Sequence, residues 1–324
     1  MGQDWAIVDM DSRVQCHIGK LGESLFHTGS QVRQMLWKKP PVPPFARKMK
    51  PSRQEGSAMA PRRLLLALPN ELVDMIFDLL GKDWNALVSL SVTCCAMWEI
   101  GIRHLHKYFV KVRAKRSSSG HRLLCLGDYT DAGDLPPHLQ LTKAEKRKFA
   151  SSAEHTLCDL TDKFRWMGRD DLRSNLIYGS GRRLHREQAV SDILEELLPR
   201  EERMPPDDVL VLRNLSKRVY VSGKAVAAFN ARMGKKYECY GSMACLGSAA
   251  LVRICWSSSS STNTPYRGPL HRGVWAGDRF DIVSEEMFEH ERGDDQPQPW
   301  ADVSKEVLAE FKAIWVAEGL FRRR

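Results

Sequence analysis

The stretch LPNELVDMIFDLLGKDWNALVSLSVTCCAMWEIGIRHLHKYF, residues 68–109, decides how this chain is organised. Its apolar residues recur at three- and four-residue spacing in three successive runs, which predicts three short amphipathic helices. Pro69 suits a first helical turn, Gly81 suits a helix end, and Asp83 suits the N-cap of a second helix. A unit of roughly forty residues buries little core by itself, so we expect its surplus apolar side chains to dock on another surface.

The residues of this stretch resemble the F-box family. The family's opening is matched by Leu68, Pro69, Glu71 and Leu72, and its Ile-Phe-x-x-Leu core is matched by residues 76–80. An apolar second helix, a Cys near its end and a following aromatic residue continue the likeness at Leu87, Leu90, Cys94 and Trp98. The sequence departs from the family at Cys95-Ala96, where basic residues are usual, and it lacks the Trp that closes the motif.

The resemblance implies docking on a Skp-type adaptor and, through it, on the cullin of an SCF ubiquitin ligase. The chain would then be a substrate receptor that presents an unknown target protein. The adaptor-binding residues that we expect are Leu68, Pro69, Leu72, Ile76, Leu80, Leu87 and Leu90. Two alternatives stay open. The helices could be a small cap on the C-terminal domain, or the chain could be an F-box scaffold outside ubiquitin transfer whose α+β domain binds a partner or small ligand.

Charge and composition limit the other classes of function. The 324 residues carry 49 Lys and Arg against 40 Asp and Glu, and residues 1–63 alone hold a surplus of six positive charges. That surplus lies in a Pro-rich stretch without sustained periodicity, so we expect residues 1–63 to be a disordered basic tail and expect no nucleic-acid partner. Met59 stands just ahead of the F-box-like stretch, and residues 1–58 could therefore be foreign to the native protein.

Cysteine usage and hydropathy point to a location inside the cell. The eight cysteines have irregular spacing, which is typical of reduced thiols rather than of a disulfide framework. No apolar run approaches the roughly 18 residues of a membrane span, and no signal segment opens the sequence. We expect a cytoplasmic or nuclear protein without a membrane partner.

The residues after the F-box-like domain (64–110) predict a second domain, residues 111–324. Residues 209–223 predict a β-hairpin, residues 251–256 and 274–283 predict strands, and an apolar stripe at 307–315 predicts a final helix. The interleaved helices and strands indicate an α+β fold with a mixed or antiparallel sheet. Several segments also resemble the C-terminal part of a large set of uncharacterised basidiomycete F-box proteins: LLCLGDY (123–129), DLPP (134–137), VLRNLSKRVYV (211–221), LVRICWSS (251–258) and HRGVWAGDRFDI (271–282).

The second domain offers only weak signs of chemistry. Its densest polar and aromatic patch consists of His271, Arg272, Trp275, Asp278 and Arg279. These residues could form a recognition pocket, or they could form a hydrogen-bonded turn that holds the sheet together. His104 and His106 diverge on a helix and do not predict a metal site. We expect no enzyme, no metal and no cofactor, and keep a cryptic active site around His271 and Asp278 as the alternative.

Overall fold

The computed structural model describes residues 2–45, 48, 68–81, 83–152, 155–166, 197, 204–239, 243–292, 299–319 and 321–323. The chain divides into two compact units. Unit 1 comprises Met1–Lys39, Ser117–Gly168 and Met204–Arg324, and unit 2 comprises Pro40–Arg116 and Arg169–Arg203. Each unit has an apolar core of its own. Among the described residues, no helix is long and apolar enough to cross a membrane.

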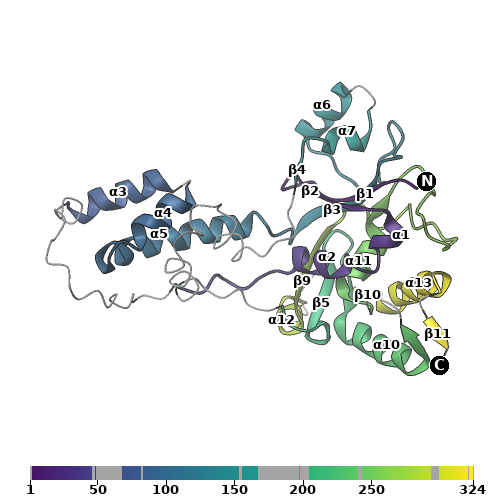
Figure 1. The fold of residues 1–324 in the computed structure, drawn as a ribbon. Coiled ribbons are helices and arrows are strands. Elements are labelled where there is room, and N and C mark those ends of the chain that lie inside the picture. Colours follow the sequence, from purple (N-terminus) through teal and green to yellow (C-terminus); the bar gives the residue numbers. More distant parts are fainter. Residues whose placement is uncertain are drawn as a thin grey trace. The chain divides into compact units, whose positions relative to one another are not determined.

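Unit 1 contains a nine-stranded mixed sheet with the order β10-β6-β5-β9-β3-β1-β2-β4, in which β8 also pairs with β3 (Figure 1). Its strands are β1 Trp5–Asp9, β2 Val14–Gly19, β3 His121–Gly127, β4 Arg165–Trp166, β5 Leu210–Asn214, β6 Val219–Ser222, β8 Cys255–Trp256, β9 Arg279–Ser284 and β10 Ala301–Asp302. A separate pair joins β7 (Tyr237–Cys239) to β11 (Phe321–Arg323). Three pairs of the large sheet are parallel and the others are antiparallel. The predicted α+β class with a mixed sheet is confirmed.

Helices cover both faces of this sheet. One face packs on α1 Leu21–Ser24, α2 Gly29–Leu36, α10 Gly223–Lys236, α11 Leu246–Ile254 and α13 Ser304–Ala317. The other packs on α6 Lys143–Ser151, α7 Leu157–Thr161 and α12 Glu285–Arg292, and a short 3-10 helix, η3, spans Asp207–Val209. Successive strand residues point to opposite faces, so Cys125 enters the first core while Leu124 and Leu126 enter the second. Because both faces are buried, these strands read as continuous apolar runs.

The N-terminal residues belong to the sheet, so the prediction of a disordered tail is wrong for residues 2–37. Strand β1 lies inside the sheet and pairs antiparallel with β2 on one edge and with β3 on the other. Its Trp5, Ile7 and Val8 are almost fully buried. The prediction failed because a five-residue strand that is buried on both faces gives neither a helical nor an alternating signal.

The rest of the predicted tail is only partly described, since residues 46, 47 and 49–63 lie outside the described residues. The hypothesis that residues 1–58 are foreign to the protein conflicts with the packing of unit 1. A chain beginning at Met59 would lack β1 and β2, and β3 would lose its antiparallel partner along one edge.

The prediction of a strand over residues 251–256 is also wrong for most of its length. Residues up to Ile254 are helical in α11, and only Cys255 and Trp256 form the short strand β8. The helix begins at Cys245, whose side chain accepts a hydrogen bond from the backbone N–H of Ser248. It packs closely on α2, because a Cβ built on Gly247 would lie 1.9 Å from the backbone oxygen of Gly29. An all-apolar run of this length fits a buried helix as well as a buried strand.

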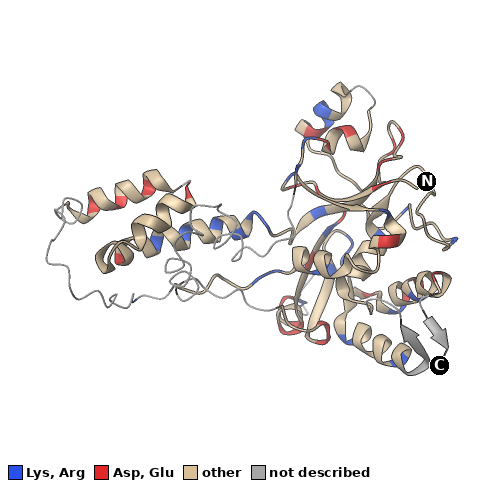
Figure 2. Ribbon diagram, viewed as in Figure 1, with Lys and Arg blue, Asp and Glu red and all other residues tan. Residues whose placement is uncertain are grey.

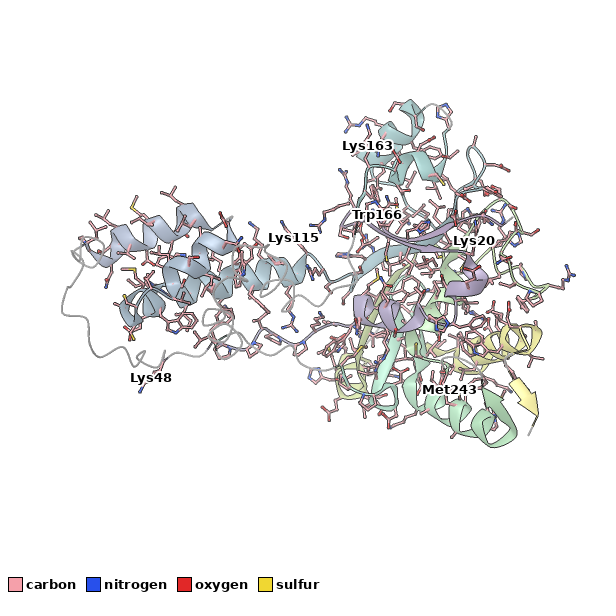
Figure 3. All side chains as sticks on the ribbon, viewed as in Figure 1. Lys20, Lys48, Lys115, Lys163, Trp166 and Met243 are labelled. Atoms are coloured by element: carbon pink, nitrogen blue, oxygen red, sulfur yellow. The ribbon has the colours of Figure 1, made fainter. Side chains whose placement is uncertain are left out.

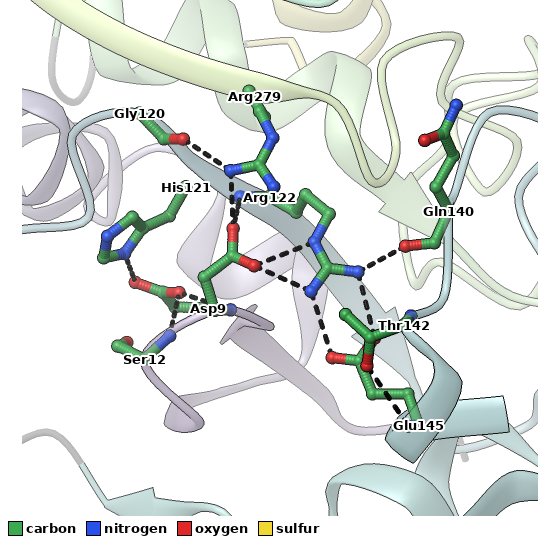
Figure 4. A network of polar contacts seen from close by, with 10 residues as sticks. Asp9, Ser12, Gly120, His121, Arg122, Gln140, Thr142, Glu145 and Arg279 are labelled. Carbon is green, nitrogen blue, oxygen red and sulfur yellow. Dashed lines mark hydrogen bonds and ion pairs between the residues drawn. The ribbon is translucent and has the colours of Figure 1, made fainter. Parts of the chain in front are cut away.

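A network of charged residues centred on the buried Arg122 joins the N-terminal segment to the rest of unit 1 (Figure 4). Arg122 of β3 donates to Asp11 through Nε at 3.0 Å and Nη2 at 2.7 Å, and to Glu145 of α6 through Nη1 at 3.1 Å and Nη2 at 3.0 Å. It also donates to the backbone oxygen of Gln140. Arg279 of β9 reaches the second oxygen of Asp11 at 2.8 Å. Loss of Arg122 would leave the buried Glu145 without its guanidinium partner, which typically costs about 3–5 kcal/mol.

A second ion pair lies beside this network. The Nδ1 atom of His121 lies 2.8 Å from Oδ2 of the buried Asp9. The hydrogen bond to Asp9 raises the pKa of His121 above its ordinary value, against the opposing effect of burial. Burial acts to raise the pKa of Asp9, but hydrogen bonds from His121 and Ser12 outweigh it, and that pKa is lowered overall.

Unit 2 contains the three predicted helices: α3 Asn70–Leu80, α4 Trp84–Ser91 and α5 Cys95–Ala114. Asp83 caps α4 by accepting hydrogen bonds from the backbone N–H groups of Asn85 and Ala86. Helices α4 and α5 meet closely at Gly101, where a Cβ would lie 2.3 Å from Oγ of Ser91. The fully or almost fully buried residues of this core include Val73, Phe77, Leu87, Val88, Trp98, Leu105 and Phe109.

Residues 40–116 are inserted between two anchored points of unit 1. Before the insertion, the backbone N–H of Lys38 donates to the oxygen of Ile282 on β9 at 2.8 Å. After it, the N–H of Ser118 donates to the oxygen of Met35 at 2.9 Å, and Gly120 bonds to Phe280, also on β9. The chain therefore leaves and rejoins unit 1 at neighbouring places.

Replacement of residues 40–116 by a short Gly-Ser linker should leave unit 1 folded, because its anchored ends lie close together and a flexible linker can join them. Deletion of residues 2–39 should instead unfold unit 1, because β1 carries hydrogen bonds on both edges. Circular dichroism and thermal unfolding of the two variants would check this. A cooperative unfolding transition in the N-terminal deletion would contradict the assignment of β1 to the core of unit 1. The absence of such a transition in the linker variant would contradict the assignment of residues 40–116 as an insertion.

The His121→Gln variant should lose stability mainly at mildly acidic pH. The contribution of His121 is complete below its unfolded pKa of about 6.5 and declines as the pH rises through the raised folded pKa. The contribution of Asp9 is present above about pH 3.9 and declines as the pH falls through its lowered folded pKa. We expect the variant to lose about 1–2 kcal/mol near pH 5.5 and less near pH 9, measured by urea unfolding. The exposed His290→Gln is the control, and an equal loss at both pH values would refute the ionic pair.

Candidate functional site

Helix α3 divides into a buried face and an exposed apolar face. Val73 and Phe77, one turn apart, lie in the core of unit 2. Leu72, Met75 and Leu79 lie on the outside, with 44%, 61% and 82% of their surface exposed. These three exposed residues are called the α3 apolar stripe below. Exposed apolar side chains that gather along one helix are typical of an interaction surface.

The predicted adaptor-binding residues fall into three groups. Pro69 and Leu72 are exposed, and four others are half-buried: Leu68, Ile76, Leu80 and Leu90, of which Leu68, Leu80 and Leu90 pack against the core. Leu87 is fully buried, so its assignment to the binding surface is wrong in this arrangement, and its role is to hold the three helices together. An apolar periodicity identifies buried and exposed apolar residues alike, because both kinds recur with the helical repeat.

The sequence-based site missed Met75 and did not include Leu79. Both belong to the α3 apolar stripe, and they are its most exposed members. Met75 follows Leu72 by three residues and Leu79 follows Met75 by four, which is the spacing that places residues on one helix face. That spacing was a signal in the sequence, but only the packing of Val73 and Phe77 shows which face is left outside.

Charged residues lie beside the stripe and join α3 to α5. Nε2 of His104 lies 2.9 Å from Oδ1 of Asp74, and Nδ1 lies 3.4 Å from Oδ1 of Asp78. The imidazole also stacks on Phe77, with ring centroids 5.2 Å apart. The hydrogen bond from His104 lowers the pKa of Asp74. Since His106 instead faces the backbone oxygen of Val42, the two histidines do not point to one site.

The predicted recognition patch does not form one site, because its residues serve separate contacts. Arg272 binds both oxygens of Asp134 at 2.8 and 2.7 Å and lies over the ring of Trp256. Trp275 is buried in the main core, where Arg253 lies 5.0 Å from its ring centroid. The backbone oxygen of His271 accepts a hydrogen bond from Ser257. The alternative interpretation of a hydrogen-bonded structural turn describes these residues better.

The other two patch residues, Asp278 and Arg279, line a polar cavity of about 570 Å³. Asp278 is 2% exposed, accepts a hydrogen bond from Asn214 at 2.8 Å, and lies 3.5 Å from Nζ of Lys217. Burial raises the pKa of Asp278. Arg122 also lines the cavity, but Asp11 and Glu145 already occupy its guanidinium.

Side chains that line this cavity make polar contacts with one another. Asp278 has an amide and an ammonium group as its partners. His271 lies outside the lining, and burial lowers its pKa. Within the part of the chain that the structure describes, no group of three or more His, Cys, Asp or Glu residues could hold a metal ion.

Arg272→Ala should lower the stability of unit 1, because it leaves Asp134 without its guanidinium partner and uncovers Trp256. We expect a loss of about 1–2 kcal/mol, at the lower end for a charged pair because the pair is partly exposed. Chemical unfolding measures this, and Arg267→Ala, an exposed arginine in the same loop, is the control. Unchanged stability with lost binding of a partner would restore the recognition interpretation.

Comparisons with known proteins add no further constraint on this site. The chain matches no protein-family model, no curated protein sequence and no solved structure. Among the described residues, the α3 apolar stripe is the clearest candidate for contact with a partner.

Proposed function

We propose that the chain is an intracellular substrate receptor of an SCF ubiquitin ligase, in which unit 2 docks on a Skp-type adaptor. Helix α3 and the two residues before it, from Leu68 to Leu80, carry the family resemblance. The α+β unit would present the target protein. A substrate receptor recognises its target protein and does not itself catalyse a reaction.

The observation that carries the proposal is the α3 apolar stripe. Leu72, Met75 and Leu79 lie outside the core of unit 2, on the helix whose sequence resembles the opening of the F-box. Ile76 and Leu80, which are both half-buried, extend the same surface. Burial of a fully exposed aliphatic side chain contributes about 1.5–3 kcal/mol, so this set can offset a substantial part of the cost of association.

Ion pairs beside the α3 apolar stripe hold α3 in a fixed position on α5. Asp74 and Asp78 are held by Arg103, His104 and Lys107 of α5. These pairs attach α3 to α5 while the apolar side of α3 stays outside. A partner would therefore meet a preformed surface, and binding would cost little conformational entropy.

Leu79→Glu should abolish or strongly weaken adaptor binding while the chain stays folded. Leu79 is the most exposed apolar residue of α3, so its replacement by a good helix former removes no core contact and places a charge in the interface. We expect at least a hundredfold loss of affinity, about 2.7 kcal/mol. Co-purification from cells that express the adaptor and cullin, followed by calorimetry with the purified adaptor, measures it.

Val110→Glu is the matched control, because Val110 is an exposed apolar residue of the same unit on α5. It should bind the adaptor as the unchanged chain does. Two outcomes contradict the proposal: the unchanged chain fails to retain the adaptor, or Leu79→Glu retains it fully. Equal losses in both variants would place the contact elsewhere on unit 2.

A further inference from the structure

Helix α5 carries a row of cations along one exposed face. Arg103, Lys107, Lys111 and Lys115 follow one another at four-residue intervals, and all four are exposed. Figure 2 shows Lys and Arg along the C-terminal half of this helix, and Figure 3 shows Lys115 projecting from its end. The four residues are called the α5 basic stripe below. No acidic residue occurs between positions 103 and 116, where six residues are Lys or Arg.

The C-terminal half of the α5 basic stripe is left without acidic partners. Arg103 binds Asp74 at 3.0 Å, and Lys107 lies 3.6 Å from Asp78. Among the described residues, no ion pair involves Lys111 or Lys115. The helix dipole stabilises cations near a C-terminus, so the fold tolerates these two lysines without an internal counter-charge. Their charge therefore remains accessible to a ligand.

The stretch of sequence that contains this stripe carries most of the net positive charge of the chain. Residues 40–116 contain 13 Lys and Arg against 6 Asp and Glu, so this stretch carries +7 of the net +9. We expected no nucleic-acid partner because the surplus of positive charge was assigned to an N-terminal tail. The charge of the remaining residues was considered only as a sum over the folded part. In the structure, the basic residues of α5 lie on one ordered helix. A row of Lys and Arg along a helix is the electrostatic pattern that accompanies nucleic-acid binding.

The composition of the stripe argues against two other partners. A membrane-surface helix must insert its apolar face, but Trp98, Leu105 and Phe109 of α5 are buried in the core of unit 2. Protein interfaces are depleted of Lys and enriched in aromatic residues, whereas Val110 is the only exposed large apolar residue on α5. Lysine ammonium groups are well suited to phosphate oxygens, which they contact as point charges.

We propose that the α5 basic stripe binds the phosphate backbone of a nucleic-acid duplex without reading its sequence. Residues four apart on a helix advance by about 6 Å along its axis, so Lys111 and Lys115 can contact phosphates at separate positions. This activity goes beyond adaptor docking and does not depend on it. Binding would bring the chain to nucleic acid through charge alone and would weaken steeply with salt.

The test measures the affinity of the full chain for a short labelled DNA duplex of mixed sequence by fluorescence anisotropy between about 50 and 200 mM salt. An RNA duplex is the second probe and distinguishes the two sources of backbone phosphate. Lys111→Gln combined with Lys115→Gln should reduce the slope of log affinity against log salt by about 1.8 for DNA, since each lost phosphate contact removes about 0.9. The affinity at 0.1 M salt should fall more than tenfold.

The matched control is Lys143→Gln combined with Lys146→Gln, two exposed lysines on α6 of unit 1, which should leave the slope unchanged. Retained adaptor binding by the α5 variant, or an unchanged circular dichroism spectrum, shows that the loss is not unfolding. The proposal is overturned if the unchanged chain does not bind either duplex or if the α5 variant keeps the full slope. It is also overturned if polyglutamate competes as well as DNA at equal charge, because the partner is then an acidic protein.

Discussion

The contact of the buried Arg122 with Glu145 and Asp11 is the interaction on which unit 1 depends. It joins the turn after β1, the strand β3 and the helix α6, which come from distant parts of the chain. Arg122 and Glu145 are buried, so water cannot readily replace either partner of that pair, whereas Asp11 lies at the exposed edge of the contact. The hydrogen bonds of β1 to β2 and β3 then fix the register of the N-terminal strands, and β9 joins this half of the sheet to β5 and β6. The N-terminus is thus part of the core of the fold.

The position of the inserted segment explains how one chain can hold two independent cores. Residues 40–116 leave unit 1 beside β9 and return beside it, so the sheet does not depend on what the insertion does. The three helices bury their own residues around Phe77 and Trp98. A small helical unit held in this way can present its outer faces to partners while the α+β unit remains unchanged.

Unit 2 presents two chemically distinct faces. The α3 apolar stripe offers aliphatic area, for which we propose an adaptor. The α5 basic stripe offers cations, for which we propose a phosphate backbone. Between them lie Asp74 and Asp78, which neutralise Arg103 and Lys107 and leave Lys111 and Lys115 accessible. The same ion pairs that attach α3 to α5 therefore limit the free positive charge to one end of the helix.

Much of the local structure followed from the sequence alone. The period of residues 68–109 determined three helices, and the β-rich run at 209–223 determined the hairpin of β5 and β6, because these signals arise between residues close in the chain. The α+β class followed from the order of such segments. For the candidate site, the sequence indicated the helix α3 and the exposed residue Leu72.

Tertiary structure decided what depends on residues far apart in the chain. The position of β1 depends on β3, more than one hundred residues away, and the helical state of residues 251–254 depends on packing against α2. Burial also separated Leu87 from Leu79, which the apolar pattern does not distinguish. The partners of Arg272, Trp275 and Asp278 are likewise distant in sequence. Local periodicity reports which residues are apolar, but only the folded chain determines which of them are covered, because covering them requires surfaces from other segments.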